Sequence, residues 1–246
     1  MKKAIIGAGV VGKAIGHKLV DVDYFDLGDV VGDDYDLYVI CTPEQVVDEV
    51  LARLPLDAKV IIKSTVPLGY TAGVGRPNVC FIPEFLREAS ALTDVMNPWR
   101  LIIEPNAREY VDLFRGPDTK IIYVDSSTEA EAIKLLSNAY LASRVVFFNE
   151  VDQLAINWDL DTSKLVEGIC ADPRIGNDYN KISAGYGGKC LPKDVDHVVN
   201  GTYFKQIKKS NADRIRYCIT NKYLLRDLEN LASESNYFKE LFDGKK

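Results

Sequence analysis

The apolar residues in the first half of the chain fall into short runs that glycine, proline and polar residues separate. These runs are short enough to be buried strands, and they cover residues 3–6, 37–41, 59–63, 79–82, 101–103 and 120–124. The segments between them that read as helices are residues 10–20, 44–54 and 107–114. Strands that alternate with helices predict an α/β fold with a doubly wound parallel sheet and right-handed crossovers.

Strand patterns largely end after residue 124, and most of the remaining chain reads as helical. Residues 128–159 predict one long central helix, because Ser127 can cap its N-terminus and Glu129 and Glu131 suit its first turn. Apolar residues occur nearly all round this helix, so we expect it to be buried on several sides. Shorter helices are expected at residues 162–168, 194–200 and 212–232. The pattern therefore predicts a small all-helical domain after the sheet.

Composition and charge exclude several classes of protein. The net charge of the 246 residues is −6, and there is no long basic run, so nucleic acid is not an expected partner. The five cysteines are widely spaced without a CxxC pair, which indicates reduced thiols in a cytoplasmic protein. With only His17 and His197, a histidine-based metal centre or Ser-His-Asp triad is not expected. No apolar run is long enough to predict a membrane span.

The first apolar run leads directly into a glycine-rich turn, Gly7-Ala8-Gly9-Val10-Val11-Gly12. Glycines at this spacing allow a tight turn, the approach of a pyrophosphate and close packing of the next helix on the strand. That helix begins at Val10 and Val11, so its N-terminus would face the phosphates. The pattern is the fingerprint of a Rossmann-type dinucleotide-binding domain. We assign residues 1–126 to this NAD-binding domain and residues 127–246 to the helical domain with the long helix.

A Rossmann-type domain has a second strand soon after its first helix, and an acidic residue at the end of that strand would bind the ribose of the cofactor. Asp26 follows Tyr24 and Phe25 at that place, which favours NAD over NADP. The spacing from the glycines is slightly short, so Asp23 and Asp29 are alternatives.

Polar residues follow three more of the predicted strands, and ligands in parallel sheets bind beyond these strand ends. They are Thr42, Thr65 and Glu84. Each residue alone could be a cap or a solvated loop residue. Together they predict a cleft, in which Thr42 and Thr65 would contact the cofactor.

The stretch Gly185 to Asp194, GYGGKCLPKD, combines a flexible loop with a cysteine and a helix start. Gly187 and Gly188 allow the backbone to bend sharply and to approach a ligand. Pro192 suits the first position of a helix, which places Cys190 just ahead of the helix N-terminus. The partial positive charge there favours the thiolate, so we interpret Cys190 as a nucleophile.

Two polar residues of the long helix, Lys134 and Asn138, are four residues apart and therefore share one face. Lys134 is either a surface lysine whose stem lies along apolar residues or a charge held inside a cleft.

With these motifs the chain resembles the nucleotide-sugar dehydrogenases, the UDP-glucose 6-dehydrogenase and GDP-mannose 6-dehydrogenase group. The resemblance covers roughly residues 1 to 200, and PEFLRE together with GYGGKCLPKD is its most specific part. The matching segments are GAGVVG at 7–12, STVPLG at 64–69, PEFLREASALTD at 83–94, NPWRLIIE at 97–104, KLLSNAYLASRVVFFNE at 134–150 and YNKISAGYGGKCLPKD at 179–194.

The resemblance implies oxidation of a sugar primary alcohol to a carboxylate with two NAD and a covalent thioester, most like the UDP-glucose type. Cys190 would then be the nucleophile that captures the aldehyde. Lys134 and Asn138 would hold the developing oxyanion at the sugar C6.

Carried over in the same way, Asp194 with Thr65 would position or activate the water. Glu84 and Glu88 would serve proton transfer and thioester hydrolysis. The residues that would line the sugar-nucleotide pocket are Phe85, Leu86, Arg87, Glu88, Lys134, Asn138, Tyr179 and Gly187. The resemblance implies no metal.

The sequence departs from the family pattern in two places. The region between Asp29 and Asp36 is compressed, and only 52 residues follow Asp194, so we expect the C-terminal UDP-binding domain to be missing. Two alternatives follow: a 3-hydroxyacid-type dehydrogenase, and a truncated, non-catalytic NAD-binding subunit. The long apolar helix also predicts a homodimer, because one small domain cannot cover it.

Overall fold

The computed structural model describes residues 1–26 and 28–234, which form two compact units. The first unit is Met1–Lys134 and the second is Leu135–Lys246, so the boundary falls within the long helix α6 (Ser127–Asn157). Each unit has hydrophobic clusters of its own, as expected for separate cores.

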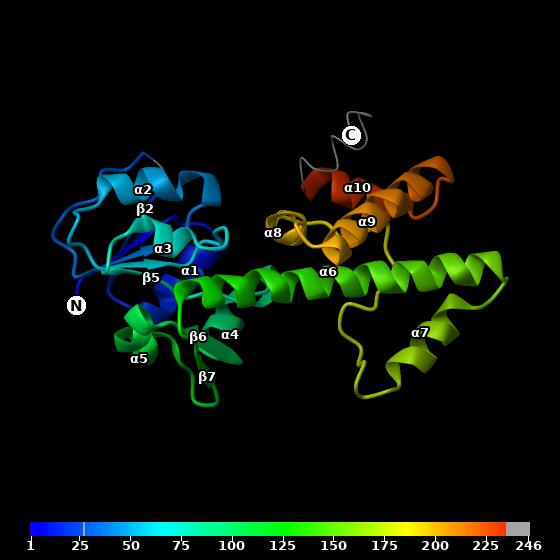
Figure 1. Ribbon diagram of the computed structural model, residues 1–246, viewed down its shortest axis with the longest axis horizontal. Helices are drawn as coiled ribbons and strands as arrows, with labels where there is room; N and C mark the ends of the chain where they lie inside the picture. Colours follow the sequence, from blue (N-terminus) through cyan, green and yellow to red (C-terminus); the bar gives the residue numbers. More distant parts are fainter. Residues whose placement is uncertain (27, 235–246) are drawn as a thin grey trace. The chain divides into compact units, whose positions relative to one another are not determined.

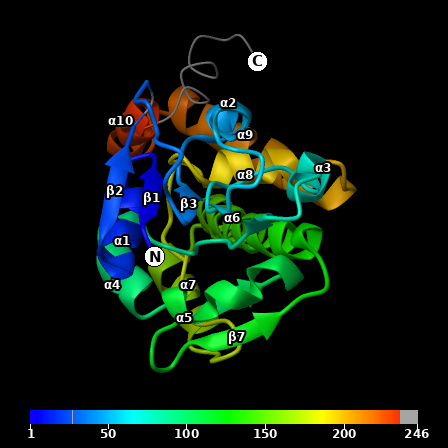
Figure 2. The same ribbon diagram turned by 90° about the vertical axis from the view of Figure 1, so that its left-hand side faces the viewer.

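A five-stranded parallel sheet in the order β2-β1-β3-β4-β5 is the centre of the first unit. Its strands are β1 (Lys3–Ile6), β2 (Val22–Phe25), β3 (Leu37–Ile40), β4 (Val60–Ile62) and β5 (Val79–Phe81). Lys3 is in register with Val22 on one side and with Leu37 on the other, and Figure 2 shows β2, β1 and β3 side by side. The predicted α/β fold with a Rossmann-type parallel sheet is confirmed.

Helices cover both faces of this sheet, which is why β3, β4 and β5 are buried along their whole length. One face packs against α1 (Val10–Leu19), α4 (Ala91–Met96) and α5 (Val111–Phe114). The other face packs against α2 (Val47–Arg53), α3 (Tyr70–Val74) and the first turns of α6.

The helices predicted at 44–54 and 107–114 each start as a 3₁₀ helix, η1 (Glu44–Val46) and η3 (Pro105–Tyr110). A third 3₁₀ helix, η2 (Glu88–Ser90), precedes α4. Such tight turns are common where a helix begins.

The last two strands, β6 (Arg100–Ile103) and β7 (Lys120–Tyr123), do not join the main sheet but pair with each other. They are parallel, with Arg100 in register with Lys120, and η3 and α5 connect them. The Arg100 guanidinium of β6 lies 4.1 Å from the centre of the Phe85 ring, so this separate sheet borders the loop at residues 83–90.

The second unit is helical, as predicted, and α6 runs through it. Figure 1 shows α8 (Leu191–Val198), α9 (Thr202–Thr220) and α10 (Leu225–Glu234) on one side of α6 and α7 (Thr162–Cys170) on the other. Small residues on α6, Ala139 and Ala142, lie buried in a cluster with apolar residues of α8 and α9.

Two details of the helical unit differ from the sequence prediction. The helix expected at 194–200 begins earlier, at Leu191. The segment 212–232 is two helices, because the backbone turns at Lys222 and Leu224, where φ is +52° at both residues. Helix α6 is buried on several sides as expected, but one stripe along it is uncovered: Phe147 and Leu154 are each 52% exposed.

Candidate active site

The glycine-rich turn between β1 and α1 has no room for side chains at two of its three glycines. Gly7 has φ of +102°, and a Cβ there would lie 2.7 Å from the carbonyl of Cys41. A Cβ at Gly12 would lie 1.9 Å from the carbonyl oxygen of Gly7. The turn is therefore as tight as the fingerprint requires, and α1 packs directly on it.

The space in front of α1 suits an anionic dinucleotide. A Cβ at Gly9 would meet nothing within 4 Å, and the first turn of α1, which Val10 and Val11 begin, has no acidic residue or side-chain cap. The Thr42 hydroxyl is buried without a hydrogen-bond partner among the described residues. Open backbone N–H groups at a helix start and an orphaned hydroxyl at a neighbouring strand end fit an NAD molecule.

The three acidic candidates for the ribose contact lie in different surroundings. Asp26 directly follows β2 and lines a cavity together with Asp29. The Asp29 carboxylate accepts a hydrogen bond from the backbone N–H of Asp26 at 2.6 Å. Asp23 lies within β2 and accepts a hydrogen bond from the Tyr35 hydroxyl at 2.7 Å. The cavity therefore favours Asp26 or Asp29 over Asp23.

The Lys134 side chain is buried inside the first unit, so this residue is a held charge and not a surface lysine. It is 5% exposed, and its Nζ donates to the Glu84 carbonyl oxygen at 2.6 Å and to Glu84 Oε1 at 3.0 Å. Glu84 Oε2 accepts a further hydrogen bond from the backbone N–H of Leu86. The Lys134 ammonium also lies 5.4 Å from the centre of the Phe85 ring. The lysine and the carboxylate therefore fix the loop that follows β5.

The rest of this loop is held by Asp94 of α4, a residue to which the sequence assigned no role. Its carboxylate accepts hydrogen bonds from the guanidinium and the backbone N–H of Arg87 and from the Ser90 hydroxyl. The Arg87 hydrogen bonds lower the pKa of Asp94 to about 2. Arg87, expected to line the substrate pocket, therefore also anchors the loop, while Glu88 is exposed at the start of η2.

In the second unit, Cys190 is the N-cap residue of α8, and Pro192 lies in its first turn. The cysteine is exposed, as a nucleophile needs to be. The sharp bends of the preceding loop are at Gly185 and Gly188, whose φ angles are +151° and +74°. Gly187, which we also expected to provide a bend, has no positive φ.

One turn into α8, Asp194 is completely buried and connects to α6. The Asn138 amide donates to Asp194 Oδ2 at 2.6 Å, and Lys193 Nζ lies 2.5 Å from Oδ1. The backbone N–H of Asp194 donates to the Cys190 carbonyl at 2.9 Å. Asn138 of α6 and Asp194 of α8 are thus joined one turn after Cys190.

Side chains that the sequence did not single out hold the loop before Cys190. Asn149 of α6 accepts from the Ser183 N–H, and Asn211 of α9 bonds both the N–H and the carbonyl of Tyr186. Arg214 of α9 donates to the Ser183 carbonyl and forms a buried ion pair with Asp152 of α6 at 2.6 Å. The only signal for Asn149 and Asp152 was a polar residue in a largely apolar helix stretch, and nothing marked Asn211 and Arg214, because α9 is rich in polar residues.

The structure therefore brings the predicted residues together in groups. One group is Glu84 with Phe85, Leu86 and Lys134, and the other is Asn138 with Asp194, whose backbone N–H donates to the Cys190 carbonyl. Thr65 is half-buried after β4, and Tyr179 is an exposed residue with φ of +56°. The catalytic, cofactor and substrate roles of all these residues remain predictions.

Comparison with known proteins identifies the central part of the chain. Residues 128–213 match the central domain of the UDP-glucose/GDP-mannose dehydrogenase family. A UDP-glucose 6-dehydrogenase of Campylobacter jejuni is 48% identical over 155 residues, which are 58% of this chain and 39% of that protein. A UDP-glucose 6-dehydrogenase of Streptococcus pneumoniae is 40% identical over 170 residues, 63% of this chain and 41% of that protein. The chain thus spans about two fifths of the length of these relatives.

Two solved structures have the same fold. A UDP-glucose dehydrogenase from Pyrobaculum islandicum matches with a TM-score of 0.71 and 24% identity over 88% of this chain and 68% of its own. A UDP-D-ManNAc dehydrogenase from Pyrococcus horikoshii matches with a TM-score of 0.75 and 17% identity over 95% of this chain and 73% of its own. The resemblance inferred from the motifs is confirmed for the matched part of the chain: residues 128–213 carry the central domain of the UDP-glucose/GDP-mannose dehydrogenase family.

Proposed function

We propose that the chain catalyses the NAD-dependent oxidation of the C6 alcohol of a nucleotide sugar to a carboxylate, as in the conversion of UDP-glucose to UDP-glucuronate. The observation that carries the proposal is the arrangement at the start of α8. There, exposed Cys190 precedes buried Asp194, which Asn138 holds from α6. The two curated relatives above are both named UDP-glucose 6-dehydrogenase, which supports this substrate.

NAD would be held by the turn of Gly7, Gly9 and Gly12 and by the N-terminus of α1, with Asp26 or Asp29 on a ribose. Bound NAD supplies a hydride acceptor, and the reaction consumes two of them for the four electrons that leave the sugar carbon. The orphaned Thr42 hydroxyl would gain its missing hydrogen bond from the cofactor. All of these proposed cofactor contacts lie within residues 1–126, which supports the predicted NAD-binding domain.

The first oxidation removes the hydroxyl proton and a hydride from C6 and leaves an aldehyde. The Cys190 thiolate then adds to the aldehyde carbon, so that a C–S bond forms and the carbonyl electrons move to oxygen. The Lys134 ammonium and the Asn138 amide donate hydrogen bonds to this oxyanion. Both groups are already held in place in the structure, by Glu84 and by Asp194.

Loss of the second hydride converts the thiohemiacetal into a thioester. Water, positioned by Asp194 with Thr65, adds to the thioester carbon, and the Cys190 thiolate leaves as the carboxylate forms. The protons released along the sequence pass to the carboxylates of Glu84 and Glu88. The remaining residues with a proposed role would line the sugar-nucleotide pocket: Phe85, Leu86, Arg87, Tyr179 and Gly187.

We further propose a homodimer in which α6 of one copy packs on the other. The half-exposed Phe147 and Leu154 on this helix, together with exposed Tyr140 and Trp158, support a covered surface there. None of the described helices is long and apolar enough to cross a membrane.

The test is NADH formation with UDP-glucose and with GDP-mannose, together with the yield of sugar acid. We expect two NADH for each UDP-glucose, and no acid from the Cys190→Ser variant. Lys189→Ala, a change of the exposed neighbour in the same loop, is the control and should retain activity.

Other results would contradict the proposal in different ways. One NADH for each substrate, with or without Cys190, would indicate the 3-hydroxyacid type of reaction. Binding of NAD without binding or turnover of either nucleotide sugar would indicate a non-catalytic NAD-binding subunit.

A further inference from the structure

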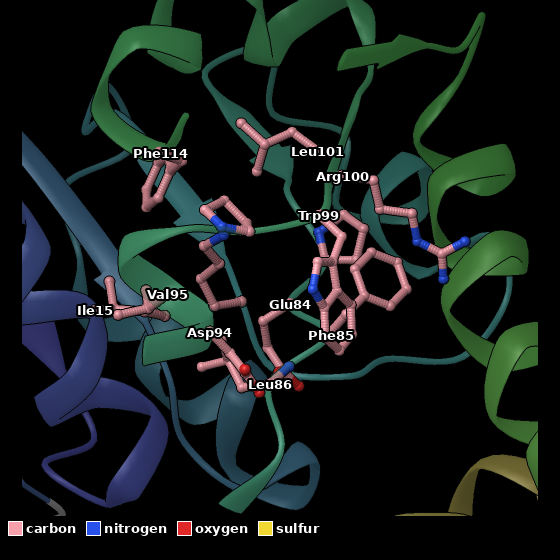
Figure 3. A pocket seen from close by; sticks show the side chains of 13 residues that line it. Ile15, Glu84, Phe85, Leu86, Asp94, Val95, Trp99, Arg100, Leu101 and Phe114 are labelled. Atoms are coloured by element: carbon pink, nitrogen blue, oxygen red, sulfur yellow. The ribbon is translucent and has the colours of Figure 1, made fainter. Parts of the chain in front are cut away.

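A small cavity lies within the first unit, between α1, α4, α5 and the ends of β4 and β5. Figure 3 shows Ile15, Val95, Leu101 and Phe114 around it, with Glu84 and Asp94 also contributing. Lys63, Pro83, Phe85, Leu86, Pro98, Trp99 and Arg100 complete the lining. Its volume of about 40 Å³ has room for roughly three water-sized groups. A nucleotide or a sugar cannot enter such a space.

Lys63 contributes a positive charge to this cavity without a hydrogen-bonding partner. The residue follows β4 directly and is 5% exposed. Among the residues that the structure describes, none accepts a hydrogen bond from its Nζ or forms an ion pair with it. The ammonium lies over the Phe114 ring, whose centre is 4.1 Å away, and it interacts electrostatically with the Glu84 carboxylate without forming an ion pair with it. Burial of an ammonium in this way is costly unless something else compensates its charge.

The acidic groups around the cavity are already engaged. Glu84 forms an ion pair with Lys134 at 3.0 Å, and Asp94 forms one with Arg87 at 2.8 Å. Each of these pairs is neutral overall, so the attraction between Glu84 and the Lys63 ammonium is largely offset by Lys134. The interior of the cavity therefore has an excess of positive charge, in a space whose other walls are mostly apolar.

We propose that this cavity binds a small anion, a carboxylate or oxyanion of about three or four heavy atoms, on the Lys63 ammonium. An oxygen of the anion would accept the hydrogen bonds that Lys63 now makes to no protein group. The walls from Ile15, Val95, Leu101 and Phe114 would exclude water around the pair and admit only a compact ligand.

The protonation of Lys63 agrees with an anion site. Burial lowers the pKa of Lys63 to about 8, so the ammonium still predominates at neutral pH although its charge is uncompensated. The buried Cys41 thiol nearby is no substitute for an anion, because burial raises its pKa to about 12 and keeps it neutral. Lys18, a second lysine near this face, donates to the Met96 carbonyl at 3.0 Å instead.

Formate is a suitable probe, because it has three heavy atoms and one negative charge. We would titrate sodium formate against sodium gluconate at constant sodium concentration and pH 7 and follow thermal unfolding. Gluconate is too large for the cavity, so it controls for ionic strength. The expected result is a saturable rise of the midpoint, about 3–5 °C when formate is tenfold above its Kd.

The matched variants are Lys63→Met, which keeps the length of the side chain but removes the charge, and Lys18→Met. The rise should disappear in Lys63→Met and persist in Lys18→Met. A wild-type midpoint that responds equally to formate and gluconate would overturn the proposal, and so would an unchanged rise in Lys63→Met.

A chemical measurement on the wild-type protein covers the case in which Lys63→Met does not fold. Isocyanic acid reacts with a neutral amine: the lysine nitrogen bonds to its carbon, and a proton moves from that nitrogen to the reagent's nitrogen. At pH 8, formate tenfold above its Kd should slow carbamoylation of Lys63 about tenfold and leave that of Lys18 unchanged, as peptide mass spectrometry can quantify. Equal carbamoylation rates at Lys63 with and without formate would show that formate does not occupy the cavity.

Discussion

The loop at residues 83–90 in the first unit and the loop at residues 179–190 in the second are fixed by different kinds of side chains. Charged groups, Lys134 and Asp94, hold the first loop. The backbone of the second loop is held by the amides of Asn149 and Asn211 and by Arg214. The charge of Arg214 is neutralised by its ion pair with Asp152. The first loop is therefore held by ionisable side chains, so its position depends on their protonation. The second loop is held mainly by amides, whose hydrogen bonds do not depend on pH.

The largest expected effect comes from opening the ion pair that supports the second loop. Asp152→Ala leaves Arg214 buried without a countercharge, so we expect the free energy of unfolding to fall by about 3–5 kcal/mol. Chemical denaturation measures this change. Asp213→Ala, which breaks the exposed pair with Arg216, is the control and should cost at most about 1 kcal/mol. A similar cost for both variants would mean that burial does not distinguish the pairs.

Around the first loop, Lys63 should make stability depend on pH. Its pKa is about 8 in the folded chain and near 10.5 when exposed, so between these values the unfolded chain binds more protons. Stability should therefore gain about 3 kcal/mol from this residue as the pH rises from 8 to 10.5, and nothing from it below pH 8.

The Lys63→Met variant isolates the contribution of Lys63. The other titrating groups are the same in wild type and variant, so their effects cancel in the difference between the two unfolding free energies. Measurements in the absence of small anions are needed, since a bound anion would hold the lysine charged. A difference that stays constant across this pH range would show that Lys63 does not titrate there.

A smaller effect is expected when one amide that holds the second loop is removed. Asn211 is buried and makes two hydrogen bonds to Tyr186, so Asn211→Ala should cost about 1–3 kcal/mol. Asn221→Ala provides the control, because this exposed amide bonds the Tyr217 carbonyl at a helix end. The cost at Asn211 should not change between pH 5 and 8; a clear pH dependence would contradict the contrast between the loops.

The smallest effect concerns Asp94, whose pKa of about 2 lies below its usual 3.8. Its stabilising contribution is present above pH 3.8 and is lost as the pH falls toward 2. We expect Asp94→Asn to cost about 1 kcal/mol at pH 5, since Arg87 is half-exposed and solvent weakens the pair. The cost should vanish near pH 2 in acid denaturation, and Asp112→Asn at an exposed pair is the control. A cost that persists at pH 2 would show that the shape of the side chain, not its charge, holds Arg87.

The sequence was a good guide where local patterns determine structure. Most of the short apolar runs became buried strands, and the spacing of the glycines at 7, 9 and 12 indicated a tight turn, so sheet and cofactor turn followed from the sequence pattern. A break such as that at Lys222 and Leu224 was missed, because neither residue is a glycine or proline.

Roles that depend on distant partners could not be predicted. Asp94 looks like an ordinary helix residue until Arg87 and Ser90 fold onto it, and Asn211 lies 25 residues from the Tyr186 backbone that it holds. Lys63 was seen only as the last residue of a strand, since its missing partner is a property of the surrounding cavity. The resemblance supplied Lys134 and Asn138, but not the groups that hold them.

The glycine-rich turn also offers a way to separate folding from cofactor binding by protein engineering. Any side chain at Gly12 collides with the turn itself, so a variant there reports only on misfolding. Gly9 has a backbone that alanine can adopt and free space around it, so a methyl group there would intrude only on an incoming ligand. Side chains of increasing size at position 9 should thus reduce the space for the cofactor stepwise while the fold stays intact.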